Sequence, residues 1–366
     1  GFAGPLRPWF APNPQVGGLY ANNGVGDFSL RWGRFGDIAN GLEVVLPSGE
    51  IVRVGAWGYK DIPVSYTRHS GGPGLVGLYA GSMGMLGVIT KLALRMVKKR
   101  RIQMYRTFGW SQHKLDDMSR FLFDLQHYDV STYHLQNYWC SRGAIRAGLA
   151  DWPAKSLGMP DEDLIIADVI QADETEDILK AKEKAIIQLA EKHRGADLGP
   201  ELCKCFHGPP WYAILLGQFY RYSPGMLAPH EAGVEAMNFI ELYYVHPVLK
   251  LQEFWHSFER IVTKWGFADA KRGPVMYIWG LEPYSVVSYP TFGYRPEIPE
   301  EVVRFKKCYQ EIYDDVRLLQ GLPYNLGRLL PDSFFTYQQG AIDMMKDIKR
   351  ALDPKNILNR GQLRWE

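Results

Sequence analysis

Residues 71–90 read Gly-Gly-Pro-Gly-Leu-Val-Gly-Leu-Tyr-Ala-Gly-Ser-Met-Gly-Met-Leu-Gly-Val-Ile-Thr. Seven of these twenty residues are glycine, so the backbone must turn tightly or let another group approach where a Cβ would collide. The residues that follow, through Met96, form an alternating apolar run that is typical of a buried strand. We therefore expect a loop that leads into a sheet. A plain surface loop would have the same composition, so the glycines alone do not establish a ligand site.

A second glycine-dense segment lies upstream, over residues 16–33, and also contains asparagines and a serine. Its backbone N–H groups can form a concavity that holds phosphate or pyrophosphate oxygens. Two strands are predicted after it, over Leu42 to Leu46 and Ile51 to Val54, joined by the hairpin signal Pro-Ser-Gly-Glu. No helix is expected directly after the glycines, so the segment is neither a Walker A nor a Rossmann motif.

The composition is that of an ordinary globular protein, with 366 residues of which 46% are hydrophobic and 22% charged. This length suffices for two domains or for one large domain with a lid. No apolar run approaches the roughly 18 residues of a membrane span, and no signal segment opens the chain, so we expect a cytoplasmic location. The 42 basic and 40 acidic residues form no long single-sign block, which argues against nucleic-acid binding.

The four cysteines are too few and too scattered for a disulfide framework. Cys203 and Cys205, followed by His207, could ligate a metal, but their spacing is not that of a zinc or iron–sulfur site. We therefore predict no metal centre.

Five separated motifs follow one another along the chain. They are Val16-Gly17-Gly18 with Ala21, Asn23 and Gly26; Leu30-Arg31-Trp32-Gly33; Gly41 to Val52; Gly77 to Thr90; and Ala351 to Leu363. Together they resemble the FAD-linked oxidases of the vanillyl-alcohol oxidase and p-cresol methylhydroxylase (PCMH) superfamily. Arg360 stands where that family more often has proline. The resemblance implies FAD as the cofactor.

The resemblance also implies an α+β fold. It places the second half of a PCMH-type FAD-binding domain over residues 1–100, a substrate-covering cap domain with an antiparallel sheet covered by helices over 101–330, and a C-terminal helix and tail over 331–366 that return to the FAD domain. Family members carry a further segment before this point. We therefore expect a second polypeptide that supplies the N-terminal half of the FAD site, either a separate gene product or another piece of a cleaved or divided chain.

The same resemblance assigns the cofactor-binding residues. Ser82 and Gly84 are expected near the phosphates, and the backbone of Gly87, Val88 and Ile89 near the adenine. The full expected set is Gly17, Gly18, Asn23, Gly24, Gly26, Arg31, Ser82, Gly84, Gly87, Val88, Ile89 and Asn359. Covalent and non-covalent attachment of the flavin are both open.

Hydrophobic periodicity in the middle of the chain predicts strands interleaved with helices, mostly without a repeated βαβ pattern, which favours an antiparallel sheet with helices on one face. We expect strands over 102–110, 164–172, 211–221, 239–246, 274–284 and 286–292, and helices over 112–125, 174–192, 248–265, 299–320 and 333–352. The aromatic side chains of this region either line a substrate face or pack against their neighbours; they include Tyr243, Tyr244, Tyr277, Trp279, Tyr284, Tyr289 and Tyr294.

The segment from Gly321 to Leu330 joins two predicted helices, at the place where relatives carry substrate-binding residues. Arg328 would bind an anionic oxygen, either phenolate or carboxylate. Tyr324 would share that hydrogen bond or act as an acid or base, and Asn325 stands where a related branch has a histidine. We assign these three residues to catalysis. The segment has no Glu-His pair, which argues against the metal-assisted 2-hydroxy-acid branch.

We predict an FAD-dependent oxidoreductase that transfers a hydride from a hydroxylated, aromatic or phenolic substrate to flavin N5. Two alternatives are open: a 2-hydroxy-acid dehydrogenase of lactate or glycolate type that feeds an electron-acceptor subunit, and a non-catalytic assembly subunit. The residues do not distinguish an oxidase from a dehydrogenase. His69 and His246 are further candidates for a flavin contact, although a lone loop histidine is more often a surface residue.

Overall fold

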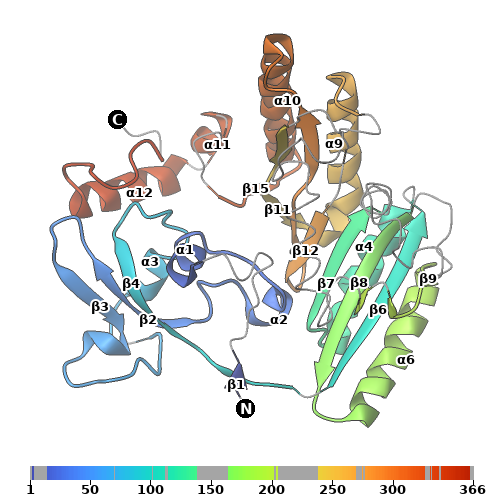
Figure 1. The fold of residues 1–366 in the computed structure, drawn as a ribbon, viewed down its shortest axis with the longest axis horizontal. Coiled ribbons are helices and arrows are strands. Elements are labelled where there is room, and N and C mark those ends of the chain that lie inside the picture. Colours follow the sequence, from blue (N-terminus) through green and yellow to red (C-terminus); the bar gives the residue numbers. More distant parts are fainter. Residues whose placement is uncertain are drawn as a thin grey trace. The chain divides into compact units, whose positions relative to one another are not determined.

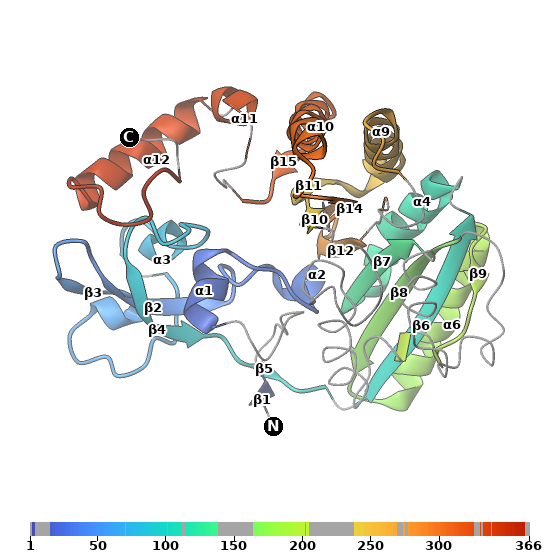
Figure 2. The same ribbon diagram turned by 45° about the horizontal axis from the view of Figure 1, so that its top comes forward.

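The computed structural model describes residues 2–3, 15–69, 71–100, 102–111, 114–137, 164–201, 203–204, 238–268, 274, 277–325, 330, 332–337 and 339–362 (Figures 1 and 2). The chain divides into two compact units. Unit 1 comprises Gly1–Lys99 with Asn325–Glu366, and unit 2 comprises Arg100–Tyr324.

Unit 1 contains a three-stranded antiparallel sheet in the order β3-β2-β4. The strands are β2 (Ala39–Val45), β3 (Ile51–Gly55) and β4 (Val88–Leu94). The predicted hairpin joins the first two: the Leu46 amide donates to the Glu50 carbonyl at 2.9 Å, and Gly49 adopts a φ of +89°, which favours glycine. The glycine-rich stretch of residues 71–87 leads into β4, as predicted, but no residue of β4 is buried, so the prediction that this strand is buried is wrong. A separate pair, β1 (Phe2–Ala3) and β5 (Val97–Lys98), completes the strands of this unit.

The loop predicted over residues 16–33 is wrong, because this segment forms two short helices. The short helices of this region are α1 (Val16–Ala21), α2 (Ser29–Trp32), α3 (Leu75–Leu78) and the 3₁₀ turn η1 (Ala56–Gly58). Tyr20 on α1 and Leu30 on α2 are buried, and Leu19 and Trp32 pack against a cluster built on Phe35. Packing of these apolar side chains outweighs the low helix propensity of the glycines.

The C-terminal part of unit 1 consists of α11 (Asp332–Tyr337) and α12 (Gln339–Leu352). Both lie within a residue of the helix predicted over 333–352, and residue 338 between them lies outside the described residues. A hydrogen bond of 2.9 Å from Lys349 Nζ to the Met85 carbonyl fixes α12 to the glycine-rich stretch.

Unit 2 is built on an eight-stranded antiparallel sheet in the order β15-β11-β13-β12-β7-β8-β6-β9, with a separate pair β10-β14. Its strands are β6 (Ile102–Ser111), β7 (Thr132–Asn137), β8 (Leu164–Asp173), β9 (Ala196–Asp197), β10 (Asn238–Glu241), β11 (Tyr244–Pro247), β12 (Tyr277–Glu282), β13 (Ser285–Ser288), β14 (Thr291–Tyr294) and β15 (Leu322–Pro323). The single strand predicted over 239–246 is wrong, because β10 and β11 pair with different partners, β14 and β13. The strand predicted over 211–221 lies outside the described residues.

Helices cover one face of this sheet, which we call the helix-covered face. They are α4 (Leu115–Leu125), α6 (Glu176–Lys192), α9 (Leu251–Lys264) and α10 (Pro299–Leu318), with the 3₁₀ turns η2 (Gln126–Tyr128) and η3 (Val248–Lys250). The Trp110 ring of β6 lies 5.0 Å from the Phe121 ring of α4, and the His246 ring of β11 stacks 4.2 Å from the Phe254 ring of α9. Residues that alternate with these along the strands form the opposite face. The predicted antiparallel α+β fold is confirmed.

Candidate functional site

The glycine-rich stretch of unit 1 turns sharply at residues 81–85, which we call the glycine turn. The Gly81 amide donates to the Tyr20 carbonyl at 3.3 Å, and the Met83 amide donates to the Ala21 carbonyl at 2.8 Å, so α1 supports the turn from one side. Met83 and Gly84 have φ angles of +51° and +73°. Consecutive residues with positive φ are uncommon and change the direction of the chain within one residue. The expected residues Ser82 and Gly84 therefore lie on a backbone turn held by α1.

Glycines of this region differ in whether the chain itself requires them. A Cβ on Gly87 would lie 2.3 Å from Val44 Cγ1, so this glycine allows close packing against β2. Among the described residues, a Cβ on Gly18 or Gly84 would meet no atom within 4 Å, and one on Gly17 would lie 3.5 Å from the Ile89 carbonyl. The space beside Gly18 and Gly84 leaves room for a ligand to approach the backbone, while the φ of +73° at Gly84 by itself favours glycine.

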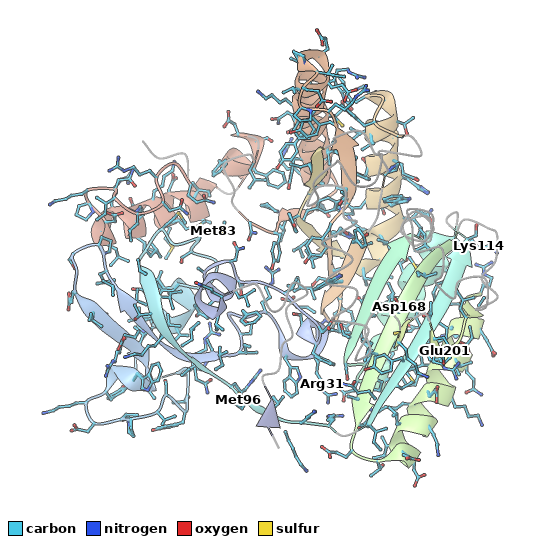
Figure 3. The ribbon with its side chains drawn as sticks, in the orientation of Figure 1. Arg31, Met83, Met96, Lys114, Asp168 and Glu201 are labelled. Carbon is cyan, nitrogen blue, oxygen red and sulfur yellow. The ribbon has the colours of Figure 1, made fainter. Side chains whose placement is uncertain are left out.

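Other expected cofactor residues have partners within unit 1. Asn23 Oδ1 accepts the Gly36 amide at 2.8 Å, the Gly24 amide donates to the Leu19 carbonyl at 2.8 Å, and the Gly26 amide donates to Ser29 Oγ at 2.9 Å. These contacts build the loop between α1 and α2. The remaining residues lie on regular elements: Arg31, labelled in Figure 3, is half-buried on α2 with its guanidinium over the Trp32 ring, and Val88 and Ile89 begin β4.

The C-terminal motif reaches the glycine turn from another side. Asn359 Nδ2 donates to the Met83 carbonyl, and Figure 3 shows Met83 next to α12. Tyr20, buried beneath the turn, donates its hydroxyl hydrogen bond to the Val76 carbonyl, and burial raises the pKa of Tyr20 to about 12. Unit 1 thus brings together α1, the glycine turn, the start of β4 and the C-terminal motif.

An aromatic cluster marks the opposite face of the sheet in unit 2. The Tyr243 and Tyr289 rings meet edge to face at 4.8 Å, and the Trp279 ring lies 5.8 Å from Tyr289. Tyr324 joins them, with its ring 6.1 Å from Tyr243 and 6.5 Å from Tyr289. Its amide donates to the Tyr243 carbonyl at 3.1 Å. We call these four residues the aromatic cluster; sequence reasoning named all of them without predicting that they meet.

The other two residues assigned to catalysis are not placed with Tyr324. Asn325 is half-buried and belongs to unit 1, whereas Tyr324 ends unit 2. Arg328 lies outside the described residues. The assignment of these three residues to catalysis remains a proposal.

Three other aromatic side chains that were candidates for a substrate face lie elsewhere. Tyr244 lies on the helix-covered face and stacks on Phe254 at 5.6 Å, and Tyr294 stacks on Phe305 of α10 at 4.2 Å. Tyr284 is exposed at the turn between β12 and β13. Alternation along the strands decides these different positions.

Sequence reasoning missed a buried carboxylate on the opposite face. Asp168, labelled on β8 in Figure 3, is 1% exposed, and its Oδ1 accepts a hydrogen bond of 2.6 Å from Thr107 Oγ1 of β6. The sequence feature that could have indicated this residue is an aspartate within the apolar run of β8. A buried carboxylate requires hydrogen bonds to offset its desolvation, and Thr107 supplies one.

The two histidines have different environments. His246 is buried, with Nε2 at 2.7 Å from Ser288 Oγ and Nδ1 at 3.0 Å from the Pro247 carbonyl. Burial lowers the pKa of His246 to about 4, so it is neutral at pH 7 and supports the core. His69 is exposed.

In the described part of the chain, no group of three or more His, Cys, Asp and Glu side chains could hold a metal ion. Cys205 and His207, two of the three residues considered for a metal, lie outside the described residues. No helix in the described ranges is long and apolar enough to cross a membrane.

Comparisons with known proteins agree on a flavin-linked family. Residues 245–363 match the family of FAD linked oxidases, C-terminal domain. A D-lactate dehydrogenase of Anaerostipes hadrus is 38% identical over 93 residues, which cover 24% of this chain and 18% of that protein. The solved structure of 4-ethylphenol oxidase from Gulosibacter chungangensis with isoeugenol aligns at a TM-score of 0.72 and 14% identity, over 96% of this chain and 70% of that one. p-Cresol methylhydroxylase with substrate bound aligns at 0.71 and 16%, over 94% and 68%.

Two findings bear on the family. Residues 245–363 match the FAD linked oxidases, C-terminal domain, and the fold is that of 4-ethylphenol oxidase and p-cresol methylhydroxylase. The predicted resemblance to the vanillyl-alcohol oxidase and p-cresol methylhydroxylase superfamily is thereby confirmed, and the match supports FAD as the cofactor. The sequence match spans only 18% of the D-lactate dehydrogenase. The sequence relative is named for lactate and the structural relatives for phenols, so the family alone does not determine the substrate.

Proposed function

We propose that this chain is part of an FAD-dependent oxidoreductase that oxidises a hydroxylated aromatic substrate of the phenol type. The aromatic cluster of Tyr243, Trp279, Tyr289 and Tyr324 is the observation that carries this proposal. Aromatic rings offer edge and face contacts to a substrate ring, while tyrosine hydroxyls can hydrogen-bond its oxygen.

The cofactor is assigned to unit 1. The open space beside Gly18 and Gly84 fits a ligand that approaches the backbone, and an amide on a tight turn is a suitable donor to a phosphate oxygen. When bound, FAD supplies the hydride acceptor that the protein side chains lack.

Three side chains have proposed roles toward the substrate. Tyr324 donates a hydrogen bond to the substrate oxygen or accepts its proton. Arg328, known only from the sequence, binds the anionic form of that oxygen. Trp279 is 7% exposed and supplies an apolar surface beside the substrate. Because this surface excludes water, it strengthens the interactions of Tyr324 and Arg328 with the substrate oxygen.

A second candidate rests on the sequence comparison. The similarity to D-lactate dehydrogenase favours a 2-hydroxy acid as the substrate and an electron-acceptor subunit as the partner. Arg328 would then bind the carboxylate of the substrate. Under either candidate, we assign the remaining walls of the flavin site to polypeptide outside these 366 residues, because the chain covers 68–70% of the two solved structures.

Anaerobic flavin reduction distinguishes the candidates. The native protein, with any chain that copurifies, is mixed with 4-ethylphenol or with D-lactate while the flavin absorbance is recorded. We expect the phenol to bleach the flavin and D-lactate to leave it oxidised; the reverse result supports the hydroxy-acid enzyme. A preparation without flavin bands contradicts both and leaves the non-catalytic assembly subunit.

Replacement of Arg328 tests the site assignment within the same experiment. Arg328→Ala should weaken substrate binding while the flavin stays bound, because the arginine is proposed to bind the substrate oxygen. Loss of flavin with unchanged substrate affinity would contradict this assignment.

A further inference from the structure

A buried ion pair lies between α12 and the C-terminal motif. Lys349 is 2% exposed and Asp353 is fully buried. Lys349 Nζ donates to Asp353 Oδ2, to the Met85 carbonyl at 2.9 Å and to the Leu358 carbonyl at 2.8 Å. A lysine ammonium has three N–H donors. All three are used, so Lys349 cannot also donate to a ligand.

Asp353 organises the chain that follows the helix. Its Oδ1 accepts the Ile357 amide at 3.0 Å, and its Oδ2 accepts the Leu358 amide at 2.9 Å. Burial alone would raise the pKa of Asp353, but the hydrogen bonds from Lys349, Leu358 and Ile357 outweigh it and lower that pKa. The pair therefore stays ionised and fixes the path of residues 353–359.

The contacts of Lys349 and Asn359 fix two carbonyls of the glycine turn. Lys349 binds the Met85 carbonyl, and Asn359 binds the Met83 carbonyl. In a planar trans peptide the C=O and the following N–H point in opposite directions. The Gly84 N–H therefore points away from Asn359. Among the described residues, no acceptor is found for this N–H.

We propose that Lys349, Asp353 and Asn359 are positioning residues that aim the Gly84 amide at a diphosphate oxygen of FAD. This inference rests on the proposed cofactor site in unit 1. A carbonyl aimed at the diphosphate would repel it, whereas an amide attracts it. With the Met83 carbonyl held by Asn359 and the Met85 carbonyl held by Lys349, the glycine turn presents a donor without any direct contact between Lys349 and the ligand.

The ion pair is not explained by stability alone. Replacing a buried ion pair with well-packed apolar side chains is often neutral or stabilising. An apolar pair could close α12 against the turn, but it could not hold the Met85 carbonyl. Arg350, which pairs with Asp347 on the exposed side of the same helix, provides a matched control.

Three probes separate positioning from folding: FAD, ADP and riboflavin. ADP carries the diphosphate without the flavin, and riboflavin carries the flavin without a phosphate. Dissociation constants are measured by flavin fluorescence and calorimetry on the native protein, together with the unfolding temperature without ligand. For Lys349→Met, we expect FAD and ADP to bind about tenfold more weakly, which corresponds to about 1.4 kcal/mol, while riboflavin affinity changes less than twofold. Arg350→Met should leave all three unchanged.

Asn359→Gly provides a second variant without a buried charge. Asn359 is exposed and has a φ of +40°, which glycine tolerates. We expect three- to tenfold weaker FAD and ADP binding at an unchanged unfolding temperature. If Lys349→Met does not fold, this variant decides the outcome.

The inference is overturned if FAD affinity is unchanged in the folded variants, or if FAD and riboflavin affinities fall together in step with the unfolding temperature. A wild-type protein that binds none of the three probes instead overturns the proposed cofactor site, and the inference with it.

Discussion

The two faces of the eight-stranded sheet carry the same kinds of side chain in different arrangements. On the helix-covered face, Trp110 packs among Phe108 and Phe121 and donates to the His193 carbonyl at 3.0 Å. On the opposite face, Trp279 meets Tyr289, which meets Tyr243 and Tyr324. The first set fills a core.

The two faces of the sheet also differ in the polar side chains that they carry. On the helix-covered face, the polar His246 is held neutral by burial and bonds Ser288. The opposite face carries Asp168 and three tyrosines that can engage a substrate oxygen. A strand sends successive side chains to opposite faces, so one strand can serve stability and function at once. We expect substitutions on the first face to change the free energy of unfolding and those on the second to change activity.

The largest expected effect is on the helix-covered face. Trp110→Ala should lower the free energy of unfolding by about 3–5 kcal/mol, because it empties a fully buried site. Denaturant unfolding followed by circular dichroism measures this change. Val303→Ala, at an exposed position of α10, is the control and should change stability by less than about 0.5 kcal/mol. A loss below about 1 kcal/mol at Trp110 would contradict the assignment of this face to the core.

The next effect is a pH dependence caused by His246. Its pKa of about 4 in the folded protein is lower than the ordinary value of about 6.5. The stability that His246 contributes is therefore fully present above pH 6.5 and is lost as the pH falls through 4, by about 3 kcal/mol in total. Unfolding measured between pH 7 and pH 4 checks this prediction. His246→Gln should remove this part of the pH dependence; an unchanged slope in the variant would assign it to other groups.

A smaller effect, on activity rather than stability, is expected on the opposite face. Tyr324→Phe should lower kcat/KM for 4-ethylphenol by about 10- to 100-fold, because a hydrogen bond to a charged oxygen contributes about 1.5–3 kcal/mol. Its unfolding midpoint should stay within experimental error of the wild type. Tyr284→Phe removes an exposed hydroxyl of the same sheet and serves as the control. Equal kinetics for the two variants would remove Tyr324 from the proposed site.

The smallest effect is a gain in stability at Tyr133 on β7. Its side chain is fully buried, and within the described residues its hydroxyl has no hydrogen-bond partner. The ring packs where Gly280 leaves room, since a Cβ there would lie 2.8 Å from Tyr133 Cζ. Tyr133→Phe removes a desolvated polar group at constant shape, so we expect a change between zero and about 1 kcal/mol in favour of folding. Thermal unfolding measures it, and a loss above 1 kcal/mol would mean that the hydroxyl has a partner.

Much of the fold could be predicted from local patterns. The apolar runs of β6 and β8 and the periodic apolar positions of α4, α6 and α9 gave elements within a few residues of their observed bounds. The failures occurred where tertiary contacts override propensity. α1 forms despite two adjacent glycines because Tyr20 is buried. The strand predicted over 239–246 divides because its two parts pair with different strands.

The candidate site could be predicted only in part. The glycines of unit 1 form motifs, so their positions could be named, yet Gly87 packs against Val44 while Gly84 has open space beside it. Nothing in the local sequence separates these two glycines. The aromatic cluster joins residues as far apart as Tyr243 and Tyr324, and no spacing rule connects them.

Local chemistry along the chain determined the glycine turn, the alternating strands, the amphipathic helices and the motifs that carry the family resemblance, because each depends on neighbouring residues. Only the tertiary structure decided which tyrosines share a face and that Asp168 is buried beside Thr107. It also decided that the three N–H donors of Lys349 bind the glycine turn and the C-terminal motif. These features depend on strand register and on contacts between distant segments. Met85, within residues 71–90, thus has its carbonyl bound by Lys349, which lies 264 residues further along the chain and forms the ion pair with Asp353.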